Sequence, residues 1–265
     1  MNLENAICLG VAGNFAQHLE QAGELKDFEH VKTEAADAPK GIFPFYLPHS
    51  KTFLGLYSIG TQVLCLPSYA SNAQVEPEIA ILCDIIYGNA HEVLDLKVQK
   101  FTTFNDCTIR KEGAKKISEK KSWGINSKGI ASQWIEVDRF EEGGVMDHYH
   151  LCSYVKREGI LHPYGVDAPL LGYSYFYSKL KTWLIQQLNT QKDFGPLEDM
   201  AKHLEACHYP KQALISIGAT AYEKFGEENY LQSGDEIYVI AYDKRVNKGT
   251  IEAEEGKVIL HQTVQ

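Results

Sequence analysis

The sequence has no surplus of positive charge, no long hydrophobic run and no recognisable leader. Its 265 residues carry 26 Lys and Arg against 35 Asp and Glu, a formal net charge of -9. Nucleic acids and anionic membranes both call for a basic face, so this balance argues against such partners. No apolar run approaches the ~20 residues of a membrane helix, and residues 1–5 lack the basic start and apolar stretch of a signal peptide. We therefore expect a cytoplasmic protein with neither a nucleic-acid nor a membrane partner.

The sequence also lacks paired cysteines and a dinucleotide-binding loop. Its six cysteines are scattered singly without a Cys-x-x-Cys pair, a pattern typical of reduced, buried thiols in a cytoplasm. Cys107 lies beside an aspartate, but a nucleophilic cysteine needs a nearby base, and the sequence assigns none. The segment Gly10-Val11-Ala12-Gly13 is not the required Gly-x-Gly-x-x-Gly. A Rossmann fold is therefore excluded, and Cys107 is interpreted as a buried thiol.

Short apolar or alternating runs separated by turns predict a strand-rich chain. The predicted strands cover residues 6–11, 42–47, 61–66, 79–87, 94–104, 131–137, 149–155, 213–221 and 237–242. Apolar residues at i+4 spacing predict a helix over 176–188, and 197–207 a second one. An early helix is expected to begin at Asn14 and end near Gly23. No repeat, low-complexity tract or linker divides the chain, so we predict a single α+β domain over residues 1–265.

Two carboxylates stand one residue apart in Glu76-Pro77-Glu78, at the start of an apolar run. In an extended strand alternate residues point to the same face, so the two glutamates project together. Bare carboxylates this close would repel by roughly 4 kcal/mol at an effective dielectric near 20, which a divalent metal would reverse. Asp106, where a later strand runs out into polar residues, offers a third oxygen ligand. Taken alone, the pair is more typical of a solvated strand entry.

The order of these landmarks resembles the fumarylacetoacetate hydrolase family. That family carries a Glu-x-Glu pair and then an Asn-Asp-x-Thr-x-Arg segment, matched here by Glu76 and Glu78 and by Asn105-Asp106-Cys107-Thr108-Ile109-Arg110. The resemblance implies a β-rich roll with a few peripheral helices. It also implies that Glu76, Glu78 and Asp106 bind Mg²⁺ or Mn²⁺, and that the chain forms a homodimer.

Further segments match the family in the same order. Asn14-Phe15-Ala16-Gln17-His18 is similar to an early segment whose histidine lies on a mobile helix over the site. Lys121-Ser122-Trp123 is similar to a Lys-Ser-Phe segment whose lysine reaches the substrate, and Lys128 is a rival for that role. The resemblance implies that Arg110 and one of these lysines hold a substrate carboxylate. Each of the three cations is alternatively a solvated surface charge.

The C-terminal third carries two more matches. Residues 214–220 and 231–235 are similar to the family's strand ending in Thr-Gly-Thr-Pro and its Leu-x-x-Gly-Asp turn. This resemblance implies that Gly218 and Thr220 contribute to substrate binding. The match as a whole extends from about residue 6 to 243.

The chain departs from the family at the groups that transfer protons and hold substrate. The family's hydrolases pair the lid histidine with a glutamate three residues later, where this chain has Gln21. Glu24, just past the expected helix end, is the nearest replacement. Leu47 stands in place of a strand lysine, and both threonines of Thr-Gly-Thr are replaced, the second by Ala219. His18 itself is also compatible with a buried structural role.

These matches predict a metal-dependent hydrolase or lyase acting on a 2-oxo acid or 1,3-dicarbonyl compound. The bound metal would act as a Lewis acid on an enolate formed by carbon-carbon hydrolysis, decarboxylation or isomerisation. His18, assisted by Glu24, would transfer a proton or position water. The alternative is a noncatalytic ligand- or metal-binding member of the same fold, which Gln21, Leu47 and Ala219 favour.

Two histidines in Asp147-His148-Tyr149-His150 raise the question of a separate zinc site. At i and i+2 they share one face of a predicted strand. No further clustered ligands accompany them, so a surface strand is the favoured interpretation.

Overall fold

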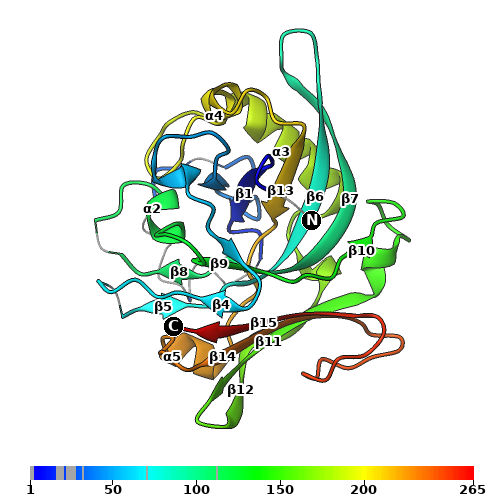
Figure 1. The fold of residues 1–265 in the computed structure, drawn as a ribbon. Coiled ribbons are helices and arrows are strands. Elements are labelled where there is room, and N and C mark those ends of the chain that lie inside the picture. Colours follow the sequence, from blue (N-terminus) through cyan, green and yellow to red (C-terminus); the bar gives the residue numbers. More distant parts are fainter. Residues whose placement is uncertain (1–2, 16–20, 22–27, 32, 70, 112) are drawn as a thin grey trace.

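The structure, a computed structural model, describes residues 3–15, 21, 28–31, 33–69, 71–111 and 113–265. Its fold is built on two β-sheets of eight and five strands, with helices at the periphery (Figure 1). A third, two-stranded pair consists of β5 (Ala73–Gln74) and β8 (Thr108–Ile109). The predicted sheet-rich α+β fold is therefore confirmed.

The eight-stranded sheet contains the longest strands of the molecule. Its spatial order is β2 (Gly41–Tyr46), β1 (Ile7–Ala12), β13 (Gln212–Ser216), β6 (Pro77–Tyr87), β7 (Val93–Asn105), β9 (Lys128–Ile130) and β3 (Ile59–Gly60), with β10 (Ile135–Glu136) also paired to β7. The first seven residues of β6 are buried, as its apolar run predicts for a central strand. The β6–β7 hairpin extends at the top of Figure 1, and its opposite end, where β6 begins and β7 ends, lies deep in the molecule.

The five-stranded sheet lies at the bottom of Figure 1. Its spatial order is β12 (Ile160–Pro169), β11 (Tyr149–Arg157), β14 (Glu236–Asp243), β15 (Lys257–Val264) and β4 (Val63–Leu64). All neighbours are antiparallel except β15 and β4. One continuous cluster of buried apolar side chains contains residues of both sheets, including Ile81 of β6 and Leu260 of β15.

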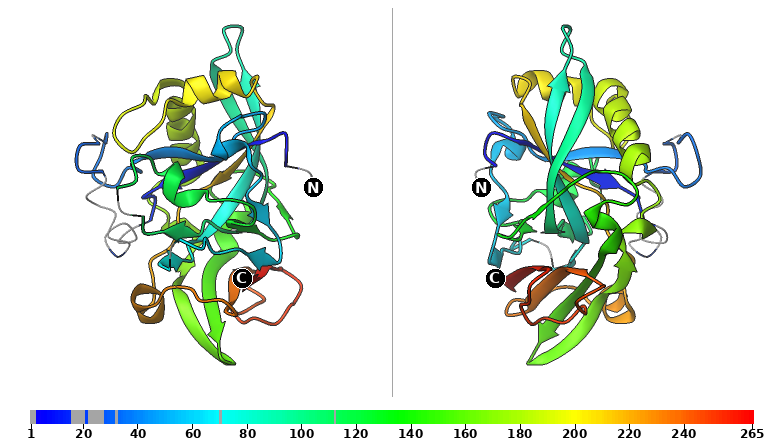
Figure 2. Two further views of the ribbon diagram at one scale, coloured as in Figure 1. Left: turned by 60° about the vertical axis from the view of Figure 1, so that its left-hand side comes forward. Right: turned by 90° about the vertical axis from the view of Figure 1, so that its right-hand side faces the viewer.

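The helices are short apart from α3 (Tyr177–Thr190), which buries Leu180, Leu184 and Leu188 as the i+4 spacing predicts. Figure 2 shows α3 beside the β6–β7 hairpin, where the Asn189 side chain also hydrogen-bonds the main chain of Val93. The other helical segments are α2 (Ser118–Lys121), α4 (Met200–Ala206), α5 (Lys224–Glu228) and the 3₁₀ turns η2 (Phe53–Gly55), η3 (Val145–His148) and η4 (Leu170–Gly172). Among the described helices, none combines the length and the apolar character needed to cross a membrane.

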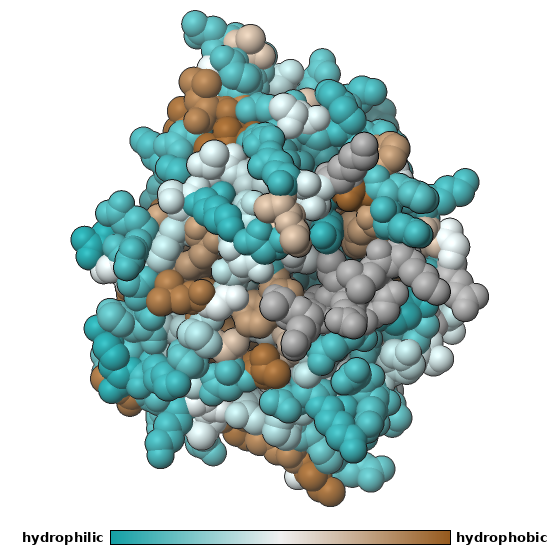
Figure 3. Space-filling view, turned by 180° about the vertical axis from the view of Figure 1, so that it is seen from behind, coloured by the Kyte–Doolittle hydropathy of each residue, from teal (hydrophilic) through white to brown (hydrophobic). Residues whose placement is uncertain are grey.

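Several predicted elements differ from the observed ones in length. The strands expected over 61–66 and 131–137 are reduced to the two-residue strands β4 and β10, and β13 ends at Ser216 instead of residue 221. The helix expected after Asn14 lies almost wholly outside the described residues. Figure 3 shows the surface from behind as mostly hydrophilic, with hydrophobic residues in separate patches and not in a continuous belt.

Candidate functional site

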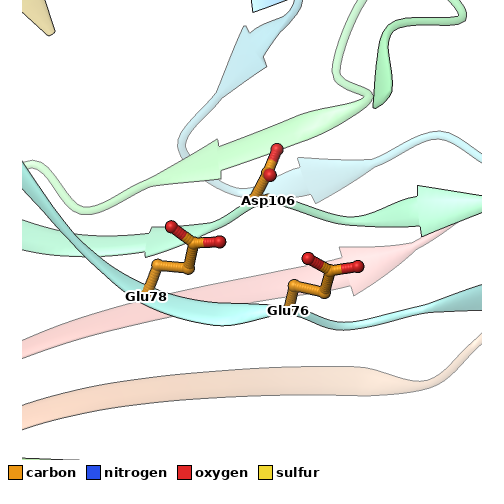
Figure 4. A group of neighbouring side chains, drawn as sticks. All are labelled: Glu76, Glu78 and Asp106. Atoms are coloured by element: carbon orange, nitrogen blue, oxygen red, sulfur yellow. The ribbon is translucent and has the colours of Figure 1, made fainter. Parts of the chain in front are cut away.

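The three predicted metal ligands come from the inner end of the β6–β7 hairpin. Glu76 directly precedes β6, Glu78 is its second residue, and Asp106 directly follows β7. The antiparallel register pairs Pro77 with Asn105, and the Asp106 N–H donates to the Glu76 carbonyl at 2.9 Å. Alternation along the strand therefore puts both glutamates on one face, with Asp106 on the neighbouring strand opposite Glu76 (Figure 4).

The side chains of these three residues converge in the interior. Glu76, Glu78 and Asp106 are all buried, and each offers a carboxylate oxygen within 4.8 Å of the other two. An all-oxygen set at this spacing fits a hard divalent cation such as Mg²⁺ or Mn²⁺ better than zinc. In the part of the chain that the structure describes, no second group of His, Cys, Asp and Glu side chains meets this condition.

Two lysines and one arginine contact the carboxylates. Lys121 Nζ lies 2.5 Å from Glu76 Oε2 and 2.8 Å from Asp106 Oδ2. Lys128 Nζ lies 2.8 Å from Asp106 Oδ1. Arg110 Nη1 lies 3.7 Å from Glu76 Oε1. Three formal negative charges thus face three formal positive ones, which limits the cost of burying the acids.

Glu78 is the acid with the least contact to these cations. Its Oε2 accepts a hydrogen bond from the Gly218 N–H at 2.8 Å. Burial, and then the charges of Asp106 and Glu76, raise the pKa of the Glu78 carboxyl well above its ordinary value, against opposing effects of Lys121 and the Gly218 N–H. Gly218 has a φ of +117°, and a Cβ there would lie 2.9 Å from the Asn14 side chain. A glycine is required here for the N–H to reach Glu78.

Arg110 is held by side chains on both sides. Its Nε donates to Gln74 Oε1 at 2.8 Å, and its Nη2 donates to the Tyr222 hydroxyl at 3.2 Å. Tyr222 is in turn bound through its main chain by Gln21, whose amide accepts from the Tyr222 N–H at 2.8 Å and donates to the Tyr222 carbonyl at 3.2 Å. Gln21, which stands where the resemblance expects a glutamate, therefore uses its amide as both donor and acceptor toward the main chain of one residue.

Lys128 is fully buried, with no exposed side-chain surface. Besides Asp106, its Nζ contacts the Cys107 carbonyl at 2.5 Å, and it lies 5.5 Å from the centre of a Trp123 ring. Burial lowers the pKa of Lys128, and Asp106 partly offsets this effect. Burial also raises the pKa of the Cys107 thiol to about 12, so this thiol has no nucleophilic thiolate at neutral pH, as the sequence indicated.

A small pocket opens beside two of the acids. Glu76, Glu78 and Lys121 line it together with Val11, Ala12, Gly13, Phe28, Phe43, Ile117 and Ala219. The predicted substrate residues Gly218 and Thr220 flank Ala219 in the sequence, and Thr220 is buried. With a volume of about 20 Å³, the pocket has room for about one water molecule next to Glu76 and Glu78.

The remaining sequence candidates are separated from this centre or lie outside the described residues. His18 and Glu24 fall among the residues that are not described. His148 lies in η3, and His150 Nδ1 contacts Asp167 Oδ1 at 2.9 Å on the five-stranded sheet. Leu47, which replaces the strand lysine, is buried.

Sequence reasoning missed Gln74 and the supporting amides. Gln74 holds Arg110 and could have been found from its spacing, because positions 74, 76 and 78 alternate onto one face. Asn105 Oδ1 accepts from the Glu76 N–H at 3.3 Å, and its amide donates to Gln262 Oε1 at 3.0 Å. No local pattern signals the Gln262 contact, because it joins residues 157 positions apart.

Solved structures similar to this chain have the fold of the fumarylacetoacetate hydrolase family. A protein from Yersinia pestis CO92 assigned to that family shares 14% identity at a TM-score of 0.53, covering 97% of this chain and 92% of the other. A 5-carboxymethyl-2-hydroxymuconate delta-isomerase from Mycobacterium smegmatis shares 17% identity at a TM-score of 0.53, and the match covers 98% of this chain and 78% of the other. A 2-keto-3-deoxy-D-arabinonate dehydratase complexed with magnesium and 2,5-dioxopentanoate shares 13% identity at a TM-score of 0.54, and the match covers 98% of this chain and 73% of the other. The predicted fold is therefore confirmed.

Within this fold, residues 24–260 match the model of the family of unknown function DUF5718, and the chain belongs to that family. The match includes all three candidate ligands and most strands of both sheets, but not β1 or the end of β15. A search of curated proteins finds no match.

Proposed function

We propose that this protein is a Mg²⁺- or Mn²⁺-dependent enzyme that acts on a small 2-oxo acid or 1,3-dicarbonyl compound. The reaction is carbon-carbon bond hydrolysis, decarboxylation or isomerisation. The observation that carries the proposal is the buried convergence of Glu76, Glu78 and Asp106 beside a pocket. The magnesium complex of the dehydratase of similar fold supports the choice of a divalent cation.

In the proposed mechanism Glu76, Glu78 and Asp106 hold the cation. When bound, it would supply Lewis-acid stabilisation of the negative charge that develops on an enolate oxygen. Gly218 fixes the orientation of Glu78 through its N–H. Asn105 does the same for the main chain of Glu76.

The substrate carboxylate is assigned to Lys121 and Arg110, which lie on the Glu76 side of the centre. Lys121 lines the pocket, whereas Lys128 is fully buried and contacts Asp106 Oδ1. We therefore assign Lys128 to the positioning of Asp106 and not to substrate binding. Gly218 and Thr220, on either side of the pocket residue Ala219, remain proposed substrate contacts. His18 and Glu24 remain the proposed residues for proton transfer.

Shape-preserving variants test the metal site and the activity together. Glu76→Gln and Asp106→Asn are each expected to lose Mg²⁺ binding, measured by calorimetry, and turnover of a panel of acylpyruvates and oxaloacetate, followed by NMR. Glu205→Gln, an exposed carboxylate on α4, is the matched control and should keep both. Full Mg²⁺ binding and turnover in either site variant would refute the proposal.

The second candidate is a noncatalytic ligand- or metal-binding protein. It is favoured because the Gln21 amide is fully engaged by the Tyr222 main chain, while Leu47 and Ala219 place apolar groups where the family resemblance expects polar ones. Calorimetric binding of 2-oxo acids without any product in the NMR assay would support this candidate. Product formation would exclude it.

We further propose that residues 1–265 form a single domain, that two chains associate as a homodimer, and that the protein acts in the cytoplasm. The resemblance to the fumarylacetoacetate hydrolase family supports the dimer, and six free thiols suit a reducing compartment. Light scattering coupled to gel filtration should give twice the mass of one chain.

A further inference from the structure

The ammonium group of Lys121 lies between two of the three proposed metal ligands. It contacts one oxygen of each, Glu76 Oε2 at 2.5 Å and Asp106 Oδ2 at 2.8 Å. Both residues belong to the group of carboxylates that converges within 4.8 Å. A single cationic side chain therefore already bridges the two strands at the point where the carboxylates meet.

We propose that Lys121 is a built-in competitor of the divalent cation, and that it must leave Glu76 and Asp106 before these acids can bind metal. This inference rests on the proposed metal site. It adds a specific role for one lysine: Lys121 sets the metal affinity and becomes available to an anionic substrate only after the metal has taken its place.

Distance and charge both oppose simultaneous binding of the ammonium group and the metal. Mg²⁺ binds carboxylate oxygens at about 2.1 Å, so a cation held by Glu76 and Asp106 would lie within a few ångströms of the present position of Lys121 Nζ. Two positive charges at that separation in a buried site repel strongly. A metal held by these two carboxylates would therefore bind at the expense of the Lys121 contacts.

The surroundings of Lys121 allow its side chain to change conformation. Its side chain lines the pocket that also contains Phe43 and Ala219, and its Nζ lies 5.3 Å from the centre of the Phe43 ring. A lysine side chain has a flexible four-carbon stem with a terminal point charge. Rotation about that stem would move the ammonium group away from the carboxylates on the side of Phe43.

Lys128 provides an internal comparison. It carries the same charge and touches the same aspartate, but it contacts Asp106 Oδ1, has no exposed surface and is fixed by the Cys107 carbonyl at 2.5 Å. It contributes to the electrostatic field of the site from behind Asp106 without bridging two ligands. A general charge effect should therefore appear in variants of both lysines, and direct competition only in variants of Lys121.

The test measures Mn²⁺ affinity of the full-length protein by electron paramagnetic resonance of free Mn²⁺. Lys121→Met is expected to bind Mn²⁺ at least about tenfold more tightly than the wild type, because no ammonium group has to be displaced. Lys121→Arg, which keeps the charge, should stay within about threefold of the wild type. Lys128→Met should change the affinity by much less than Lys121→Met.

Circular dichroism of each variant verifies folding, and Lys121→Gln replaces Lys121→Met if the latter does not fold. If the wild type binds Mn²⁺ as tightly as both neutral Lys121 variants, competition is refuted and the metal site stands. Equal gains in Lys121→Met and Lys128→Met would likewise refute direct competition, in favour of a general field effect. If neither the wild type nor any Lys121 variant binds Mn²⁺, the proposed metal site fails together with this inference.

Discussion

At the scale of single residues, the burial of Glu78 lowers the stability of the metal-free protein. Metal binding, and not stability, is therefore the proposed role of this acid. Its pKa is raised by burial and by the neighbouring acids Asp106 and Glu76, so the ionised form destabilises the folded protein at neutral pH. Glu78→Gln keeps an oxygen that accepts from the Gly218 N–H and removes the charge. We expect this variant to stabilise the metal-free protein by about 1–3 kcal/mol, measured by urea unfolding at pH 7 in a chelator.

Mg²⁺ should reverse the order of stability, so that the wild type becomes more stable than Glu78→Gln. A ligand that binds only the folded state stabilises it by mass action, so added Mg²⁺ should raise the unfolding midpoint of the wild type and leave Glu78→Gln nearly unchanged. The exposed substitution Glu205→Gln serves as the control that follows the wild type in both conditions. A Glu78→Gln variant that is less stable than the wild type in chelator would contradict this account of Glu78.

At the scale of secondary-structure elements, Glu236 ties together three strands of the smaller sheet. Its carboxylate accepts from Tyr238 of its own strand β14 at 2.7 Å, contacts Lys156 of β11 at 2.9 Å, and contacts His261 of β15 at 3.0 Å. The hydrogen bond from Tyr238, and then that from Lys156, lower the pKa of Glu236 to about 2. The three strands thus share one partly exposed charge cluster.

The lowered pKa defines a pH dependence of unfolding. An unfolded glutamate has a pKa of about 4.3, so the contribution of Glu236 is complete above that pH and is lost as the pH falls toward about 2. Because 30% of the side chain is exposed, we expect Glu236→Gln to cost less than about 1 kcal/mol at pH 7. The difference from the wild type should shrink between pH 4.5 and pH 3 in urea titrations, and a constant difference would refute the assignment.

The elements also mark the limit of what the sequence could predict. The hairpin that carries the site was predictable, because β6 is a long apolar run and β7 alternates apolar and polar residues over much of its length. Strand β12 was not, since Pro163 and Pro169 argue against a strand, and they are tolerated because β12 lies at the edge of its sheet. Strand β15 was hidden by polar positions such as Gln262, which is fully buried because it hydrogen-bonds Asn105.

The candidate site shows the same division. The positions of Glu76, Glu78 and Asp106 follow from strand alternation and from motif order, which are local properties. The pairing of Lys128 with Asp106 and of Gln21 with Tyr222 depends on how distant segments pack. Sequence spacing therefore predicted the acids but could not separate the roles of Lys121 and Lys128.

At the scale of the whole molecule, the shared core predicts that the two sheets unfold together. The same buried cluster contains Ile81 of β6, the strand that carries Glu78, and Val239 and Leu260 of the smaller sheet. Elements that share one apolar core lose their packing in one cooperative step. We expect a single calorimetric transition whose calorimetric and van 't Hoff enthalpies agree at low protein concentration.

Leu260→Ala tests whether the two sheets unfold as one unit. Leu260 is fully buried in β15, whereas the acids lie at the end of the β6–β7 hairpin in the other sheet. Removing a buried leucine side chain costs about 2–5 kcal/mol, and a shared core transmits that loss to the whole chain. The complete transition should therefore shift to lower temperature, and Mn²⁺ binding should disappear at the same temperature as the circular dichroism signal. Two transitions, of which Leu260→Ala moves only one, would mean that the sheets are separate folding units and that the metal site belongs to one of them alone.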